Sequence, residues 1–373
     1  MRIDPRILET LCCPVTREPV GPMTGTEVGR LNAALAQGRV RYTGGVPVGE
    51  ALESGLSTAD GASVYRILDG VPVLLPELRI LNSPPDQSPA EAAPTTDTGG
   101  LARLWDAWSE KWGTFVPPAR PNAEDVGGFE TLIGDVCAEE HLIAPRALLL
   151  GVTSEIATMR WPAGTRLLAL DFSEAMIRKI WPWGSAPGAT VARGNWKAMP
   201  VLDAAYDIVI GDGVLLWQQY PDDVIALATE VRRVLKDTGA FVMRLMAKPE
   251  RDEPLDAVFD SLRRGRIANS AMLHLRIGMA LHRDLRSGVR LGDVYDAWHA
   301  NVPDEDVLLP SLGWPPEMVR TFEVYRGSET TVAYPTAAEV SDLLSRDFRR
   351  TACLFHEYDE RGMFPTVVLR PTP

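Results

Sequence analysis

The chain has 373 residues, of which 45% are hydrophobic and 24% charged, with a formal net charge of −12. This is the composition of an ordinary globular protein, and its acidity argues against a broad nucleic-acid footprint. No apolar run approaches the roughly 18 residues of a membrane span. The first residues lack the apolar core of a signal peptide, and the four cysteines are sparse. We therefore expect a cytoplasmic protein.

The sequence of residues 1–80 predicts a small domain of mixed helices and strands. A helix-like ILETL at 7–11 precedes CCPVTREPV, and the unit ends in SVYRILDGVPVLLPE. In that last segment, alternating apolar residues lead into an Asp-Gly turn, which predicts a β-hairpin. The phrases LCCPVTREPV and YRILDGVPVLLPE resemble the small zinc-ribbon-like proteins that activate tRNA and translation-factor methyltransferases. The resemblance implies an activator-like α+β domain, supplied in cis, that covers an apolar face of a catalytic partner.

The zinc ligands of that family are missing from this unit. A structural zinc needs about four Cys or His ligands, usually in two pairs. Thr16 stands where the first pair would be completed, and no second pair follows before Tyr65. Cys12 and Cys13 are adjacent, which is poor geometry for two ligands of one ion. We predict no metal here.

Residues 81–100 are rich in proline and small polar residues and predict a linker. The following segment, LARLWDAWSEKWGTF, places Trp105, Trp108 and Trp112 at helical spacing on one face. That face fits either core packing or a lid helix over an active site. The second unit then extends over 101–373.

Apolar segments alternate with helical ones through this second unit. We expect strands at 146–151, 166–171, 189–193, 206–211, 239–246, 351–357 and 365–370. We expect helices at 130–141, 154–159, 173–181, 222–235 and 336–346. Such alternation predicts an α/β fold with a doubly wound, mostly parallel sheet covered on both faces. Residues 248–333 interrupt the pattern as a helical cap insertion.

The order of segments between 166 and 246 carries a second resemblance. LLALD ends in Asp171 and precedes the helical FSEAMIRKI; GNWKAMP and the strand-like YDIVIGDGVLLW follow. This order resembles class I S-adenosylmethionine (SAM)-dependent methyltransferases. The resemblance implies a seven-stranded Rossmann-like sheet, SAM as cofactor and S-adenosylhomocysteine as product. A carboxylate at the end of a strand can accept hydrogen bonds from both ribose hydroxyls.

The resemblance places cofactor-binding residues at the carboxyl ends of the strands. They are Gly151, Thr153, Ser154, Asp171, Phe172, Met176, Asn195, Trp196 and Gly211. The Gly-rich turn of the family is reduced to one glycine in LLLGVTSEIATM, and Asn195 replaces the usual aspartate. Thr153 and Ser154 are expected to cap the next helix. Asp171 has an alternative as a helix N-cap, and the neighbouring apolar residues have one as core packing.

Methyl transfer from a sulfonium requires alignment and, for a protonated acceptor, a base. Asp212, after the fourth strand, is a candidate for positioning the acceptor or taking its proton; its alternative is to shape the turn. In the insertion, His274 and His299 are candidate bases, as is His282 on the same face as His274. Each histidine also has a structural alternative. No spacing of ligands suggests a metal.

These observations predict an enzyme, a SAM-dependent methyltransferase acting on an O or N of a small-molecule or peptide acceptor. One alternative is modification of tRNA or a translation protein, suggested by the N-terminal resemblance and the arginines at 263–290. An alternative of another class is a non-catalytic methyltransferase-like scaffold. The sequence is compatible with a monomer and with a homodimer.

Overall fold

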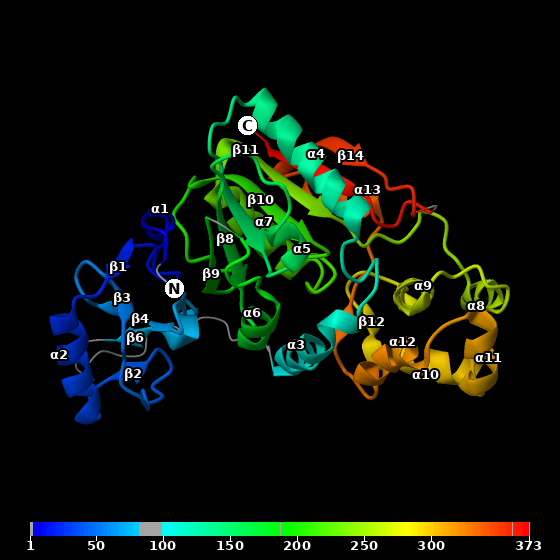
Figure 1. The fold of residues 1–373 in the computed structure, drawn as a ribbon, viewed down its shortest axis with the longest axis horizontal. Coiled ribbons are helices and arrows are strands. Elements are labelled where there is room, and N and C mark those ends of the chain that lie inside the picture. Colours follow the sequence, from blue (N-terminus) through cyan, green and yellow to red (C-terminus); the bar gives the residue numbers. More distant parts are fainter. Residues whose placement is uncertain (1–2, 82–98, 187, 360, 373) are drawn as a thin grey trace.

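The structure, a computed structural model, describes residues 3–81, 99–186, 188–359 and 361–372. The predicted linker therefore lies almost entirely outside the described residues. Figure 1 shows a small N-terminal domain in blue, a central sheet domain in green and red, and a helical cap in yellow and orange. Within the described ranges, no helix combines the length and the apolar character needed to cross a bilayer.

The small domain is built on short antiparallel strands. Its elements are α1 (Pro5–Leu8), β1 (Val20–Pro22), α2 (Gly25–Ala36), β2 (Arg41–Tyr42), β3 (Gly55–Thr58), β4 (Ser63–Leu68), β5 (Val71–Pro72), η1 (Pro76–Leu78) and β6 (Ile80–Leu81). The predicted hairpin is confirmed, because β4 pairs antiparallel with β5. Asp69 and Gly70 between them have φ values of 51° and 82°, as a two-residue hairpin turn requires.

The two adjacent cysteines lie inside this domain. Cys12 and Cys13 are both buried and carry free thiols. The sulfur of Cys13 lies 3.1 Å from the hydroxyl oxygen of Tyr65. Across the described part of the chain, no group of three or more potential metal-ligating side chains comes together.

The central domain contains a seven-stranded sheet in the order β14-β15-β11-β10-β7-β8-β9. Its strands are β7 (Arg146–Leu150), β8 (Arg166–Asp171), β9 (Ala189–Arg193), β10 (Tyr206–Asp212), β11 (Leu235–Arg244), β14 (Phe348–Leu354) and β15 (Thr366–Pro371). The strands from β9 to β11 are parallel, and β15 runs antiparallel to both of its neighbours. The predicted α/β, Rossmann-like class is confirmed.

Helices cover both faces of this sheet. They are α4 (Ala123–Glu139), α5 (Ser154–Ala157), α6 (Glu174–Ile180), α7 (Asp222–Val234) and α13 (Ala337–Leu344). Helices α4, α5 and α6 share one hydrophobic cluster with the sheet. Helices α7 and α13 share the other cluster, which also includes residues of the small domain. Because strand side chains alternate between faces, Leu149 joins the first cluster and Leu148 the second.

The small domain adds to the edge of the central sheet. Val73 forms a parallel bridge with Arg193 of β9. The N–H of Leu74 donates to the carbonyl of Arg193 at 2.7 Å. On the other side of the interface, Leu11 bridges with Val201. The small domain therefore shares backbone pairing, as well as a hydrophobic core, with the central domain.

The cap follows β11 and has a hydrophobic core of its own. It contains α8 (Leu255–Arg263), α9 (Ser270–Leu281), β12 (Val289–Arg290), α10 (Leu291–Asn301), α11 (Glu305–Leu312), α12 (Pro316–Val319), η3 (Arg320–Tyr325) and β13 (Thr331–Val332). Helix α3 (Gly99–Lys111), followed by η2 (Trp112–Thr114), contacts both α6 of the sheet domain and η3 of the cap. It therefore bridges these two parts (Figure 1).

Candidate functional site

A cavity of about 1080 Å³ opens where the sheet domain, α3 and the cap meet. Its floor comes from residues at the carboxyl ends of β7, β8 and β10. In open α/β sheets this edge is where ligands bind. The lining includes Gly151, Thr153, Asp171, Phe172, Met176, Asn195, Trp196, Asp212 and His274, all of which were expected from the sequence.

The turn after β7 leaves its main chain open to the cavity. Gly151 has a φ of +105°, a conformation that side chains disfavour. A Cβ built there would lie 3.8 Å from the ring of Trp196 and 4.0 Å from Oδ2 of Asp171. Gly151, the one glycine left in the turn that is Gly-rich in the resembling family, thus lies close to both Trp196 and Asp171.

The two hydroxyl residues after this glycine behave differently from the expectation. Thr153 lines the cavity, but its side chain makes no capping hydrogen bond to α5. The hydroxyl of Ser154 donates to its neighbour Glu155 at 3.0 Å. Ser154 and Gly211 lie outside the lining. The prediction that both hydroxyls cap α5 was wrong.

Asp171 lies at the end of β8 and is only 7% exposed. Its Oδ1 accepts from the N–H of Ser173 at 2.8 Å. The helix cap itself is supplied by Ser173, whose Oγ accepts from the N–H of Met176, so the N-cap alternative for Asp171 was wrong. Burial raises the pKa of Asp171 to about 7, although the N–H groups of Ser173 and Phe172 act in the opposite direction.

Asn195 and Trp196 form another part of the cavity wall. Oδ1 of Asn195 accepts from the N–H of Lys197 at 2.9 Å, which closes a tight turn. The indole N–H of Trp196 donates to the carbonyl of Leu170 at 2.6 Å. This bond holds the ring against the end of β8, beside Gly151.

The small domain also reaches the cavity, which sequence reasoning missed. Leu75 and Glu77 are among the lining residues. They follow Leu74, whose backbone is paired with β9. No local signal could have revealed this contribution, because it depends on docking between segments that are far apart in the sequence.

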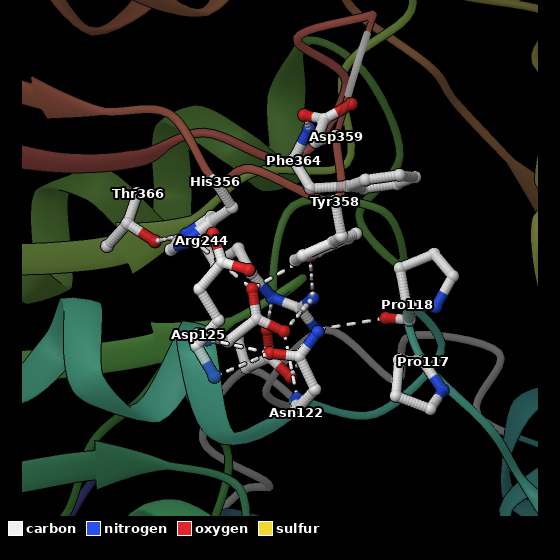
Figure 2. A network of polar contacts seen from close by, with 12 residues as sticks. Pro117, Pro118, Asn122, Asp125, Arg244, His356, Tyr358, Asp359, Phe364 and Thr366 are labelled. Carbon is white, nitrogen blue, oxygen red and sulfur yellow. Dashed lines mark hydrogen bonds and ion pairs between the residues drawn. The ribbon is translucent and has the colours of Figure 1, made fainter.

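Asp212 ends β10 and belongs to a buried ion network. Arg244, which is 0% exposed, donates to it through Nε–Oδ1 at 2.6 Å and Nη2–Oδ2 at 3.0 Å. Figure 2 shows the same guanidinium reaching Asp125 at 3.0 Å, the hydroxyl of Tyr358 and the carbonyl of Pro118. Burial disfavours the charged guanidinium, but the two carboxylates raise the pKa of Arg244 above its ordinary value.

This network bears on the roles expected for Asp212. Burial raises its pKa, and the paired Arg244 acts against that shift. Both oxygens already accept strong hydrogen bonds from a cation, so the carboxylate is held in one orientation at the cavity wall.

The cap histidines separate into one that reaches the cavity and two that do not. His274 of α9 lines it and is 8% exposed. Burial holds the pKa of His274 well below its ordinary value, so the ring is neutral at neutral pH. Within the described chain its Nε2 has no hydrogen-bond partner. His282 lies outside the lining.

The prediction of His299 as a catalytic base was wrong. Helix α10 turns Leu291 and Val294 toward the cavity. His299 is five residues beyond Val294, about 140° around a helix of 3.6 residues per turn. It lies instead beside Tyr295 and near Glu305, with 39% of its side chain exposed.

Aromatic side chains form the wall between α3 and the cap. Trp105, Trp108 and Trp112 all line the cavity, together with Trp217. Trp217 packs edge-on against Trp105 at 5.2 Å and against Trp108 at 4.8 Å between ring centroids. The helix α3 therefore both packs against the cap core and covers the site, as the two expectations for its tryptophan face suggested.

Comparison with known proteins identifies one domain in the chain. A family model described as a methyltransferase domain matches residues 148–243. These residues include β7 through most of β11, and with them the cavity floor. The match supports the expected cofactor, SAM. Among curated proteins, no significant match is found.

Many solved structures match this chain, and those compared below do so at low sequence identity. A protein from Rhodobacter sphaeroides described as a Zn-dependent alcohol dehydrogenase is 12% identical, with a TM-score of 0.47, over 74% of this chain and 100% of that one. The CcbJ methyltransferase from Streptomyces caelestis is 13% identical, with a TM-score of 0.43, over 72% and 98%. The 1,6-didemethyltoxoflavin-N1-methyltransferase from Burkholderia thailandensis, solved with its acceptor and S-adenosylhomocysteine, is 12% identical, with a TM-score of 0.38, over 84% and 98%.

Proposed function

We propose that this chain is a SAM-dependent methyltransferase that modifies an O or N of a small-molecule acceptor. The observation that carries the proposal is the pairing of Asp171 with Gly151 at the floor of the cavity. Asp171, at the end of β8, faces the open main chain of Gly151 in the turn after β7. The methyltransferase-domain match over 148–243 supports the same reading.

The residues around this pair fit the adenosyl part of SAM. The carboxylate of Asp171 would accept from the ribose hydroxyls. The backbone at Gly151 allows close approach of the amino-acid end. Phe172, Trp196 and Leu75 offer apolar surface for the adenine ring. Bound SAM supplies a methyl group on a positively charged sulfur, which is ready for in-line displacement.

The chain's own residues then hold the acceptor and exclude water. Helix α3 and the cap enclose the cavity, which favours alignment of the reacting atoms. Asp212, held rigidly by Arg244, offers a fixed hydrogen-bond acceptor. His274 contributes an uncharged ring to the lining. The enclosed site favours a small molecule over a peptide.

Calorimetric titration with S-adenosylhomocysteine tests the cofactor site. We expect wild-type protein to bind with a dissociation constant in the micromolar range. The Asp171→Ala variant loses one or two charge-assisted hydrogen bonds, which costs about 2–4 kcal/mol. Asp237→Ala, which removes a side chain that is 89% exposed, serves as the matched control. Failure of folded wild-type protein to bind would favour the scaffold alternative, and unchanged binding by Asp171→Ala would refute the site.

A further inference from the structure

We propose that the acceptor is an uncharged, flat aromatic small molecule, which packs among the α3 tryptophans and the rings around them. The proposal rests on the proposed methyltransferase function and specifies its substrate class. It combines three features of the acceptor side of the cavity: its aromatic walls, the state of its charges, and its volume.

The walls on this side are aromatic and already packed edge to face. Besides its contacts with Trp105 and Trp217, Trp108 lies 5.3 Å from the ring of Phe115 and 6.3 Å from that of Tyr325. All five rings line the cavity. Aromatic rings gain from offset-stacked or edge-on partners beyond the area that they bury. A planar ring system is therefore the ligand that these walls fit best.

On this side of the cavity, the charged side chains of the described lining are either paired with an opposite charge or exposed. Asp212 is paired with Arg244, Arg326 with Glu323, and Glu329 with Arg290. Arg103 is exposed. A phosphate or carboxylate on the acceptor would lose its water and gain at most the exposed Arg103, which is weak compensation. Nucleotides and acidic peptides are therefore disfavoured as ligands.

The volume of the cavity also favours a small acceptor. Pockets for drug-sized ligands measure about 300–1,000 Å³. A cavity of about 1080 Å³ has room for a cofactor and one modest acceptor. It has no room for a folded macromolecule, although a single extruded residue or base would fit by size. The charge distribution above argues against that base, because its phosphates would enter with it.

His274 adds to the aromatic wall and brings no charge to it. Its ring packs edge-on against Phe322 and tilts toward Tyr325, and its Nε2 is closed off from the cavity. Burial holds the pKa of His274 well below its ordinary value, so the neutral ring fits an uncharged acceptor.

The test compares a neutral naphthalene probe with one that carries a phosphate, on protein saturated with S-adenosylhomocysteine. By calorimetry we expect 2-naphthol to bind in the micromolar range, at least tenfold more tightly than 2-naphthyl phosphate. Equal or tighter binding of the phosphate, or no binding of 2-naphthol, would overturn the proposal. Binding of S-adenosylhomocysteine is measured first, so failure of the cofactor site is recognised separately.

Variants locate the probe. Trp217→Leu should weaken 2-naphthol binding about tenfold while leaving the affinity for S-adenosylhomocysteine within a factor of two. Trp183→Leu changes a half-exposed tryptophan outside the lining and serves as the control. If Trp183→Leu and Trp217→Leu change 2-naphthol affinity equally, the assigned position is wrong.

Discussion

Arg244 binds Asp212 through two parallel hydrogen bonds while it contacts Asp125 with a third nitrogen–oxygen pair. One buried cation thereby joins the end of β10, the last residue of β11 and the first turn of α4. Tyr358 completes the cluster from the segment before β15, because its hydroxyl donates to Asp125 at 2.8 Å. The network joins Asp212, which lines the cavity, to α4. Figure 2 shows Arg244 with Asp125 and Tyr358.

Removing this cation should destabilise the protein strongly. Arg244→Leu would leave two buried carboxylates without a counter-ion, which typically costs about 3–5 kcal/mol. Urea unfolding followed by circular dichroism measures the change. Arg264→Leu, at an exposed arginine, is the control and should change stability by less than about 0.5 kcal/mol. A loss below about 1 kcal/mol for Arg244→Leu would contradict the proposed dependence of the fold on this ion.

Changing only the charge of Asp212 should have a smaller effect. Asp212→Asn keeps the shape, and Arg244 keeps Asp125 as counter-ion. We expect a loss of about 1–3 kcal/mol in unfolding free energy. The affinity for S-adenosylhomocysteine should stay within a factor of two if Asp212 contacts the acceptor, as we propose. A tenfold loss of cofactor affinity would instead place Asp212 in the cofactor site.

Much of the fold followed from the sequence because its strands are continuous apolar runs. The predicted strand at 166–171 has the bounds of β8. The helix expected at 130–141 begins earlier, at Ala123, because Asn122 and Asp125 form a capping box. That pair was present in the sequence as a start signal. The presence of this helix was thus easier to predict than the residue at which it begins.

The site was predictable where it depends on strand ends and unpredictable where it depends on distant partners. Asp171 and Gly151 meet because parallel strands bring their carboxyl ends to one edge. Arg244 was missed, although an arginine within FVMRLM signals that a buried cation needs a carboxylate nearby. His299 was misplaced because the sequence does not say which face of α10 turns inward.

Docking of the small domain should depend on Glu230. This buried carboxylate of α7 accepts from Arg17 of the small domain at 2.9 Å and from the N–H of Met199 at 2.7 Å. It also accepts from Arg233. Glu230→Ala would remove a buried carboxylate partner from two arginines, which keep their backbone partners, and would leave the N–H of Met199 unsatisfied, so we expect a loss of about 2–4 kcal/mol.

The matched variant for this interface is Glu230→Gln. It keeps the volume and the oxygen acceptor but removes the charge, and it should lose roughly half as much stability. Thermal or urea unfolding of both variants gives the comparison. Equal stability of Glu230→Ala and wild type would mean that the backbone pairing of Leu74 with Arg193 holds the domains together without this ion pair.

The raised pKa of Asp171 gives the site a pH dependence with a definite sign. Its pKa is about 7 in the folded protein, against an ordinary value of 3.8. Between these values the unfolded chain ionises while the folded one keeps its proton. Folding stability from this group is therefore highest at acid pH, falls as pH rises from about 4 to 7, and stays low above that.

Asp171→Asn removes this cost, because an amide does not ionise. The shift of about three units sets an upper limit of about 4 kcal/mol, and we expect the variant to gain about 1–3 kcal/mol relative to wild type between pH 5 and pH 8. Urea unfolding at both pH values measures the gain. Affinity for S-adenosylhomocysteine should move oppositely: in wild type it should increase toward pH 8, because the ionised carboxylate is the stronger acceptor for ribose hydroxyls. In the variant it should be weak and independent of pH. A stability difference that does not change with pH would mean that Asp171 is already ionised at pH 5, and that burial does not hold its proton.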